Sequence, residues 1–353
     1  MDAQNAQPAR FDLRRPASLE ARFAGLRDFF VSGATRPLAF RKRQLGALRT
    51  ALVHHEPALL GALHADLHKP PQEAYATEVG FVQSEIDYAL RHLTRWARPA
   101  RTRTPLLVWP AKASVCPEPY GVVLVIGPWN YPLQLLLSPL IGAIAAGNCA
   151  CLKPSELAPA TSAAIAALVA DTFPAHYITA VEGPRETSQA LLELDFDYIF
   201  FTGSAPVGRA VMTAAARHLT PVTLELGGKS PCIVCADTDL DVAARRIVWG
   251  KFTNAGQTCV APDFVLVDER AEHRLLDSLQ RALAAFYGSD PRRSRDYGRI
   301  VNPHHFNRLV RYLNDGRAVC GGQSVPDELY IAPTILTQVD PASPVMQEEI
   351  FGP

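Results

Sequence analysis

A cysteine in an unusual local sequence is the first candidate for chemistry. Cys259 stands in the stretch Asn-Ala-Gly-Gln-Thr-Cys-Val-Ala-Pro-Asp, residues 254–263. The glycine and the X-Pro step predict irregular backbone at the end of a helix, where a thiol can meet a substrate. Most cysteines are small packing residues in apolar runs, but Asn, Gly, Gln and Thr do not fit a core. We therefore interpret Cys259 as a nucleophile.

A carboxylate upstream of this cysteine is the candidate base. Residues 221–226 are predicted to form a strand that leads into a Gly-Gly step, and Glu225 lies between Leu224 and Leu226. The alternation places Glu225 on the opposite sheet face from the two leucines, at the end of the strand. A carboxylate there can activate water as a general base, or it can be paired and structural.

An asparagine between two prolines is the candidate hydrogen-bond donor. Asn130 lies between Pro128 and Pro132, directly after the strand-like run 122–126. This rigid setting suits a positioned side chain. The same Trp-Asn-Tyr sequence is also compatible with a packed loop.

Glycines at a predicted strand-to-helix junction indicate a phosphate-binding turn. Residues 201–208 read Phe-Thr-Gly-Ser-Ala-Pro-Val-Gly. Backbone N–H groups and the helix dipole at such a junction can meet a pyrophosphate. The pattern lacks the G-x-G-x-x-G of a Rossmann turn and the Lys-Ser/Thr of a P-loop, so ATP is disfavoured.

The elements that would position these residues alternate along the chain. Apolar residues at helical spacing predict helices over residues 18–30, 40–67 and 73–98, before a Pro- and Arg-rich stretch, 99–119, that is predicted to be an extended excursion or hairpin. Short strands then alternate with helices, which predicts a parallel sheet covered on both faces. The strands are 122–126, 150–153, 178–181 and 198–201, and the helices are 133–146, 159–172, 185–194 and 207–218.

A second α/β portion follows the Gly-Gly step. It is predicted to contain strand 232–234, helix 240–254, strand 264–267 and helix 272–286, with apolar segments around Val319 and 331–336. The acidic cluster 237–241 is interpreted as a cap of the helix that follows it. Cys232 and Cys235 form a CxxC, but the strand-like surroundings favour packing over redox chemistry.

Five segments of the chain, in the same order, resemble the aldehyde dehydrogenase superfamily. They are the cysteine segment 254–263 and four further stretches: Pro-Trp-Asn-Tyr-Pro at 128–132, Lys-Pro-Ser-Glu at 153–156, Leu-Glu-Leu-Gly-Gly-Lys at 224–229 and Glu-Ile-Phe-Gly-Pro at 349–353. The Ala-Pro-Asp after the cysteine resembles the class 3 branch. The resemblance extends from about residue 45 to residue 353.

This resemblance implies an α/β fold with a Rossmann-type cofactor domain and a second α/β catalytic domain. Residues 1–98 and 120–225 would form the NAD(P)-binding domain, 99–119 a bridging arm for oligomerisation, and 226–353 the catalytic domain. Related proteins continue past the Glu-Ile-Phe-Gly-Pro segment, so we expect a C-terminally truncated chain with an incomplete catalytic domain. A full-length relative would form a homodimer and sometimes carries a membrane anchor in the remaining part.

The resemblance also assigns roles to the candidate residues. Cys259 would attack an aldehyde to form a thiohemiacetal, which yields a thioester after hydride transfer to the nicotinamide. The Asn130 side chain and the Cys259 backbone N–H would hold the oxyanion, and Glu225 would activate water for hydrolysis. The expected reaction converts an aromatic or medium-to-long-chain aliphatic aldehyde into a carboxylic acid.

NAD or NADP is the cofactor that the resemblance implies. Its phosphates are expected to contact Gly203, Ser204, Val207 and Gly208. Its adenosine ribose is expected to contact Lys153 and Glu156, and its nicotinamide half Glu349 and Phe351. A carboxylate at the ribose favours NAD, whereas Lys153 tolerates a 2′-phosphate, so use of both stays open.

Two alternatives compete with this activity. The thioester can pass its acyl group to CoA, although a water-activating Glu225 would then be wasted. The chain can also be a catalytically incomplete binding or scaffold protein that derives from the family, which the early chain end favours and the intact Cys259, Glu225 and Asn130 oppose.

Composition sets the outer limits. The 353 residues allow two domains, and 35 Lys and Arg balance 35 Asp and Glu, so no net field recruits nucleic acid or an anionic membrane. Seven cysteines without framework spacing favour free thiols in a reducing, cytoplasmic compartment. Residues 1–20 contain no secretory signal, and the apolar stretch 133–152 is interrupted by polar residues, Pro and Gly. We predict no metal site, since His64 and His68 lack further ligands.

Overall fold

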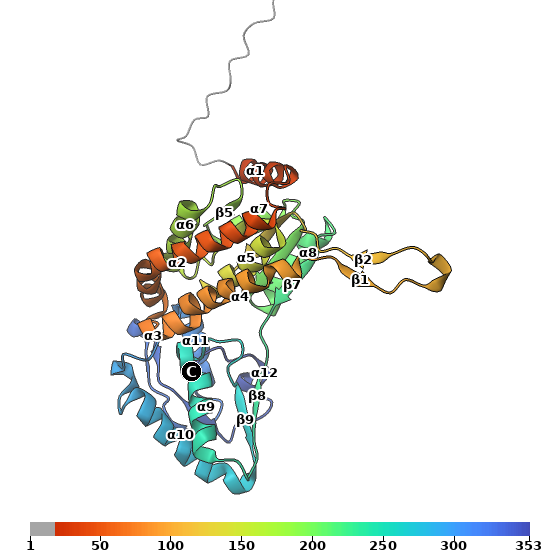
Figure 1. Cartoon of the computed structure of the whole chain (residues 1–353). Coiled ribbons are helices and arrows are strands. Elements are labelled where there is room, and N and C mark those ends of the chain that lie inside the picture. Colours follow the sequence, from red (N-terminus) through yellow and green to blue (C-terminus); the bar gives the residue numbers. More distant parts are fainter. Residues whose placement is uncertain (1–17) are drawn as a thin grey trace, which may run out of the picture.

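The computed structural model describes residues 18–353, which form two lobes and a projecting arm (Figure 1). The lobes correspond to two hydrophobic cores. One core gathers buried residues between Leu26 and Ala215, and the other gathers residues between Val234 and Val345. The first 17 residues of the predicted segment 1–98 lie outside the described part of the chain.

A five-stranded parallel sheet is the centre of the first lobe. Its strand order is β5-β4-β3-β6-β7, and every neighbouring pair is parallel. The predicted alternation of strands and helices is confirmed. The strands are β3 (Val122–Ile126), β4 (Cys149–Lys153), β5 (Ile178–Ala180), β6 (Tyr198–Thr202) and β7 (Val222–Glu225), and the helices between them are α5 (Gln134–Ala146), α6 (Pro159–Thr172), α7 (Arg185–Leu192) and α8 (Ala205–Ala216).

The strand order predicts a ligand-binding crevice at one edge of the sheet. From β3 the chain winds outward to β4 and β5, then crosses to the other side of β3 to form β6 and β7. In open parallel sheets, ligands bind outside the carboxyl ends of the strands at the point where the winding reverses. That point lies between β3 and β6, and the loops after β3, β4, β6 and β7 meet at this edge.

Four helices, three of them long, precede the sheet in sequence. They are α1 (Leu19–Val31), α2 (Leu38–Leu67), α3 (Pro71–Ala74) and α4 (Gly80–Trp96). The helix predicted over 73–98 is interrupted by a π-helical turn, Tyr75–Val79. Such turns widen the backbone locally and are frequent at functional sites. Here the turn contains Glu78, a fully buried carboxylate.

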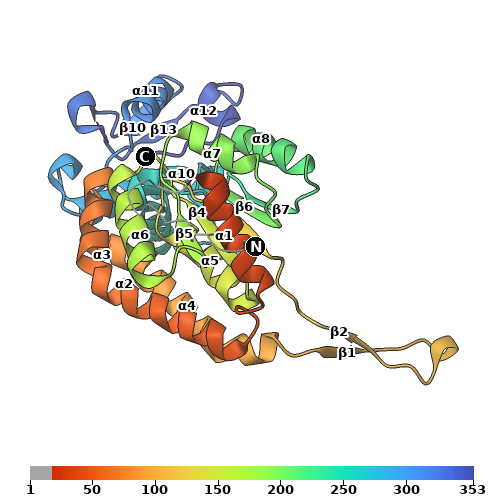
Figure 2. The same cartoon turned by 90° about the horizontal axis from the view of Figure 1, so that it is seen from above.

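A two-stranded hairpin projects from the first lobe (Figure 2). It consists of β1 (Ala100–Thr102) and β2 (Ala113–Val115), which pair antiparallel, with a short 3₁₀ turn, Leu106–Val108, near its tip. The extended hairpin predicted from the Pro-rich composition is present. Its tip exposes Leu106 and Leu107 by 90% and 96% and Trp109 by 77%.

The second lobe is built on two parallel strands and long helices. The predicted helix 240–254 ends earlier, at Phe252, because Asn254 and Ala255 have left-handed φ angles of 53° and 51°. As predicted, the start of this helix is capped: the Asp239 side chain accepts hydrogen bonds from two backbone N–H groups. No helix among residues 18–353 is long and apolar enough to cross a membrane. The elements of this lobe are β8 (Pro231–Val234), α9 (Leu240–Phe252), β9 (Phe264–Val267), α10 (Glu272–Tyr287), α11 (Pro303–Tyr312), β10 (Arg317–Cys320), β11 (Ser324–Val325), β12 (Tyr330–Ile331), β13 (Ile335–Thr337) and α12 (Pro344–Gln347).

Candidate active site

Cys259 lies in the loop between α9 and β9, half-buried and outside regular structure. The buried side chain of Gln257 fixes this loop. Its Nε2 donates to the carbonyls of Asn254 at 3.0 Å and Arg299 at 2.9 Å, and its Oε1 accepts from Val301 N at 3.0 Å. The thiol therefore lies on irregular backbone, as predicted, in a loop that these hydrogen bonds hold in place.

Three consecutive residues in left-handed conformation lead from α9 into this loop. Asn254, Ala255 and Gly256 have φ angles of 53°, 51° and 75°. This conformation costs roughly 1–2 kcal/mol for a residue with a Cβ. At Gly256 a side chain is also excluded by space, because a Cβ would overlap the carbonyl of Gly352. The glycine thus lets the Glu-Ile-Phe-Gly-Pro segment pass directly behind the cysteine loop.

Asn130 lies against the same loop from the other lobe. It is 2% exposed, and its Nδ2 donates to the Gln257 carbonyl at 3.0 Å. The backbone carbonyl of Asn130 accepts hydrogen bonds from Lys69 Nζ at 3.1 Å and from Asn254 Nδ2 at 2.8 Å. One hydrogen of the Asn130 amide is engaged by Gln257, which leaves the other for a further acceptor.

Glu349 and Glu225 are the two carboxylates whose negative charge raises the pKa of the Cys259 thiol. Glu225 is the last residue of β7 and is exposed. No hydrogen bond or ion pair joins its carboxylate to another residue within 18–353. The charge of Glu349, from the end of the chain, and that of Glu225 both disfavour a thiolate at Cys259. The two carboxylates and the thiol thus converge at the boundary of the lobes.

Burial raises the pKa of the Cys259 thiol above its ordinary value. The N–H groups of Cys259 and Val260 oppose this by favouring the thiolate, while Glu349 and Glu225 raise the pKa further.

We expect the free enzyme to alkylate slowly at neutral pH. Because the thiolate is the reactive form and its pKa is raised, the rate of iodoacetamide addition at Cys259 should climb about tenfold per pH unit and keep climbing past pH 9. Mass spectrometry of the Cys259 peptide measures this rate, with Cys259→Ala to assign the adduct. A plateau reached near neutral pH would contradict the raised pKa.

The Glu349 carboxylate is half-buried against the glycine turn after β7. The backbone N–H of Gly228 donates to Glu349 Oε1 at 3.3 Å, and burial raises the pKa of this carboxyl group. A Cβ at Gly227 would overlap the same carboxylate, whereas a Cβ at Gly228 meets nothing within 4 Å. Gly227 therefore makes room for Glu349.

This difference gives a matched pair of variants. Gly227→Ala should displace the flexible Glu349 side chain. Because Glu349 is expected to bind the ribose, the KM for cofactor should rise roughly tenfold, which corresponds to the loss of one charge-assisted hydrogen bond. Gly228→Ala should leave this KM within about twofold. Steady-state kinetics with varied cofactor compare the two, and equal effects would argue against the assigned role of Glu349.

Phe351 and Trp129 join the chain end to the Asn130 loop. Their rings meet edge to face with centroids 5.2 Å apart, and Trp129 also contacts His305 at 5.0 Å. Phe351 itself has a left-handed φ of 53°. The segment that contains Glu349 and Phe351 thus lies beside the loop that holds Asn130.

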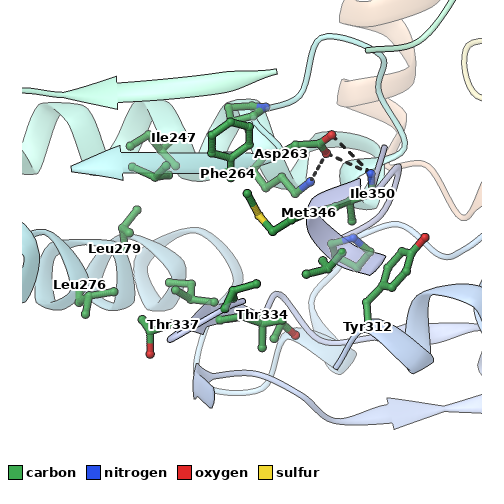
Figure 3. A pocket seen from close by; sticks show the side chains of 18 of the residues that line it. Ile247, Asp263, Phe264, Leu276, Leu279, Tyr312, Thr334, Thr337, Met346 and Ile350 are labelled. Atoms are coloured by element: carbon green, nitrogen blue, oxygen red, sulfur yellow. Dashed lines mark hydrogen bonds and ion pairs between the residues drawn. The ribbon is translucent and has the colours of Figure 1, made fainter. Parts of the chain in front are cut away.

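Asp263 anchors the backbone next to Glu349. Its buried carboxylate accepts from the Ile350 N–H at 3.3 Å (Figure 3). It also lies 3.6 Å from Lys229 Nζ and 3.7 Å from Lys251 Nζ. Burial lowers the pKa of Lys251 to about 8. Lys251 was not predicted from the sequence, because it lies on the amphipathic helix α9 with other charged residues and shows no local sign of a partner.

A cavity of about 410 Å³ lies beyond Asp263 and Ile350. Its walls are mostly apolar and come from α9, β9, α10, α11, β13 and the chain end, with Leu279, Thr334 and Met346 directed toward it (Figure 3). Cys259, Asn130 and Glu225 do not line it. It is therefore distinct from the reactive centre.

The expected cofactor contacts gather at the carboxyl edge of the sheet. Lys153 ends β4, is 1% exposed, and its Nζ donates to the Pro154 carbonyl at 2.8 Å and to Glu156 at 3.1 Å. After β6, Gly203 donates to the Glu225 carbonyl at 3.0 Å, and Ser204 is the N-cap of α8. These residues flank the crevice between β3 and β6 together with the loop that holds Asn130.

Comparison with known proteins gives the family. The sequence pattern of the "Aldehyde dehydrogenase family" matches residues 9–353. The chain is 49% identical over 337 residues to the 4,4'-diaponeurosporen-aldehyde dehydrogenase of Staphylococcus aureus, which covers 95% of this chain and 73% of that protein. It belongs to the aldehyde dehydrogenase family.

Further relatives agree with this assignment. The mouse aldehyde dehydrogenase family 3 member B1 is 48% identical, with 95% of this chain and 72% of that protein covered, and the dog dimeric NADP-preferring aldehyde dehydrogenase is 47% identical, with 93% and 72% covered. A substrate-bound structure of Staphylococcus aureus AldH superimposes with a TM-score of 0.93 at 48% identity, over 96% of this chain and 74% of that one. The expected resemblance to class 3 is confirmed.

This aldehyde dehydrogenase is an oxidoreductase that converts aldehydes to acids with NAD or NADP. The expected aldehyde dehydrogenase fold is likewise confirmed. A betaine aldehyde dehydrogenase of Staphylococcus aureus, solved in complex with NAD⁺, has the same fold with a TM-score of 0.84 at 26% identity, over 94% of this chain and 69% of that one.

The predicted crevice of this aldehyde dehydrogenase offers groups that suit a dinucleotide. The first-turn N–H groups of α8 have no intrahelical partner and favour a phosphate. Val207 in that turn is 49% exposed, and Gly208 lets the helix approach Leu226, which a Cβ would meet at 2.8 Å. At the end of β6 the Thr202 hydroxyl is buried without a partner among the described residues. A bound polar ligand can satisfy it.

Three charged residues beneath the site were missed by the sequence analysis. Lys69 and Glu78 are 0% exposed, and Glu73 accepts from the Asn254 N–H at 2.8 Å. Burial raises the pKa of Glu73 to about 7. The sequence feature that could have indicated their burial is the five-residue spacing of Glu73 and Glu78. This spacing does not match one face of an α-helix, but it matches the wider π-helical turn.

Proposed function

We propose that Cys259, Asn130 and Glu225 carry out the oxidation and that the substrate is an aromatic or medium-to-long-chain aliphatic aldehyde. The supporting observation is the hydrogen bond from Asn130 Nδ2 to the Gln257 carbonyl, which seats the amide beside the cysteine loop. Residues from both lobes meet there with the two carboxylates that act on the thiol. The substrate range follows from the class 3 resemblance.

Cys259 begins the reaction by adding its thiolate to the carbonyl carbon, so that an S–C bond forms and the oxygen becomes an oxyanion. The free hydrogen of the Asn130 amide and the Cys259 backbone N–H stabilise that charge, an effect worth roughly 10²- to 10³-fold per donor. The nicotinamide, when bound, supplies the hydride acceptor. Lys153, Glu156, the start of α8, Glu349 and Phe351 would hold the cofactor along the crevice.

Glu225 completes the reaction by hydrolysis. Its unpaired carboxylate takes a proton from water, the hydroxide adds to the thioester carbon, and the S–C bond breaks to release the acid and the Cys259 thiolate. A structural carboxylate would have a partner, and Glu225 has none within the described chain. This favours the role of base over that of a paired surface residue.

Trapping the acyl-enzyme tests the proposed chemistry. The enzyme is mixed with benzaldehyde and NAD or NADP, quenched in acid and digested, and the Cys259 peptide is analysed by mass spectrometry. We expect an acyl adduct at Cys259 that requires cofactor. Turnover without such an adduct, or an adduct on another cysteine, would refute the assignment.

We also propose that the lobes correspond to functional domains. Residues 1–98 and 120–225 would form the cofactor domain and 226–353 the catalytic domain, with 99–119 as the arm. The two separate hydrophobic cores support this division. Seven free cysteines support a reducing, cytoplasmic location.

A homodimer formed through the arm is a further proposal. Two strands alone are marginally stable, and the exposed tip leucines need a covering surface. Leu107→Asp should shift the mass in solution from dimer to monomer, as measured by light scattering. Leu219→Asp is the matched control, since Leu219 is 89% exposed on the main body. A dimer that survives Leu107→Asp would contradict the proposal.

A further inference from the structure

A buried ion pair lies directly beneath the Asn130 loop. Lys69, between α2 and α3, and Glu78, in the π-helical turn, are both 0% exposed, and Lys69 Nζ lies 2.5 Å from Glu78 Oε1. The Lys69 ammonium also lies 4.1 Å from the centre of the Tyr131 ring. Neither residue is within the segments that carry the proposed chemistry.

The pair holds the Asn130 loop, residues 127–133, at its middle and at its C-terminal end. Lys69 donates to the Asn130 carbonyl at 3.1 Å. The second oxygen of Glu78 accepts from the N–H groups of Leu133 at 2.9 Å and Gln134 at 3.2 Å, where α5 begins. The segment between these contacts has no helix or strand of its own, so side chains must fix its backbone.

Stability is a poor explanation for this arrangement. Taking two charges out of water costs several kcal/mol per ion, and apolar residues of similar volume are often as stabilising as a buried pair. A buried pair with excellent geometry does fix the groups that it bonds. Here those groups are the Asn130 carbonyl and the start of α5, which together set the direction of the Asn130 side chain.

We propose that Lys69 and Glu78 are positioning residues that hold the Asn130 amide in the geometry needed for the oxyanion. This inference rests on the proposed role of Asn130 as donor. The pair acts on the backbone of Asn130 and the amide acts on the substrate, so the proposed route from Lys69 to the substrate passes through Asn130. Displacement of a catalytic group by about 1 Å can cost about 10²-fold in rate.

The test uses a neutral variant that preserves shape. Lys69→Met/Glu78→Gln removes both charges and keeps an acceptor for the start of α5. We expect kcat to fall between about tenfold and 10²-fold, with the KM for cofactor within about twofold. Arg49→Met/Asp87→Asn is the matched control, because this exposed pair, 2.6 Å apart, joins α2 to α4. It should leave kcat unchanged.

A double-mutant cycle separates positioning from general support. Asn130→Ala retains the backbone carbonyl that Lys69 binds but removes the amide. If the pair acts through Asn130, adding Lys69→Met/Glu78→Gln to Asn130→Ala should lower kcat by less than about twofold further. Additive losses would overturn the inference, as would an unchanged kcat in the neutral variant.

Two other outcomes are distinguishable. If Asn130→Ala keeps the wild-type kcat, the proposed donor role fails and this inference fails with it, whereas a low kcat in Asn130→Ala beside a normal kcat in the neutral variant removes only the inference. Glu78→Gln alone guards against misfolding of the double change. In the wild type, Lys69 and the start of α5 bind different oxygens of Glu78, and the glutamine has an oxygen at only one of these two places. A severalfold loss in kcat therefore supports positioning, and no loss opposes it.

Discussion

Replacing Cys259 by alanine is expected to abolish aldehyde oxidation while cofactor binding persists. The sulfur is the only protein atom in the proposed reaction that bonds to the substrate carbon, and no neighbouring side chain is proposed to replace it. Removal of a nucleophile from a working constellation typically costs on the order of 10⁴-fold or more in kcat. Absorbance of the reduced cofactor measures turnover, and calorimetry measures cofactor binding.

The control for this variant is another exposed thiol. Cys235 is exposed on the loop after β8, and Cys235→Ala should retain full turnover. Turnover of Cys259→Ala above about 1% of wild type would place the reaction elsewhere. Loss of cofactor binding in Cys259→Ala would instead indicate a disturbed loop, which circular dichroism and thermal unfolding would also detect.

Replacing Glu225 by glutamine is expected to stop the reaction after one turnover. The amide cannot accept a proton from water, so the thioester should form but not hydrolyse. We expect a burst of about one reduced cofactor per enzyme, followed by a steady rate lowered by roughly 10²- to 10⁴-fold. Stopped-flow absorbance resolves the burst, and mass spectrometry shows the accumulated acyl group.

Glu193→Gln is the control, since Glu193 forms an exposed ion pair with Arg217, and it should behave as wild type. Addition of CoA to the stalled Glu225→Gln enzyme asks whether a thiol can remove the acyl group. Rapid release by CoA in the wild type, faster than hydrolysis, would favour the acyl-transfer alternative. A Glu225→Gln variant with neither burst nor turnover would assign Glu225 to an earlier step.

Much of the fold follows from local pattern. The runs of β3 and β4 are apolar without alternation, which is typical of strands buried on both faces, and both are fully buried in the sheet. Helix α10 carries apolar residues at helical spacing and begins at the predicted Glu272. Such features depend on neighbours in sequence, so they can be inferred from sequence.

Other features depend on distant partners. Helix α9 ends at Phe252 because the chain turns left-handed and brings Cys259 beside the first lobe. Gly256 indicated irregular backbone here, but the local sequence did not set the residue at which the helix ends. The π-helical turn exists where Glu78 meets Lys69. Helix α11 was not predicted, although Asn302 caps it with a side-chain bond to His305 N at 2.9 Å.

The candidate site divides in the same way. Cys259, Glu225 and Asn130 stand in segments whose local composition is odd for a core or a surface, so they attract attention in sequence alone. Lys69, Glu73 and Lys251 resemble ordinary helix-surface residues. Only tertiary packing buries them beneath the loops, and a single sequence contains no record of which charges meet.

The site also depends on contacts between residues far apart in the chain. Asn130 meets Gln257 across 127 residues, Glu73 meets Asn254 across 181, and Gly228 meets Glu349 across 121. Loops of such length close late, because the entropy of closure must be overcome before the contacts stabilise anything. During refolding, helices and the parallel sheet should therefore form well before enzymatic competence returns. On mild heating, activity should be lost first, when the lobes separate and each still retains its own core.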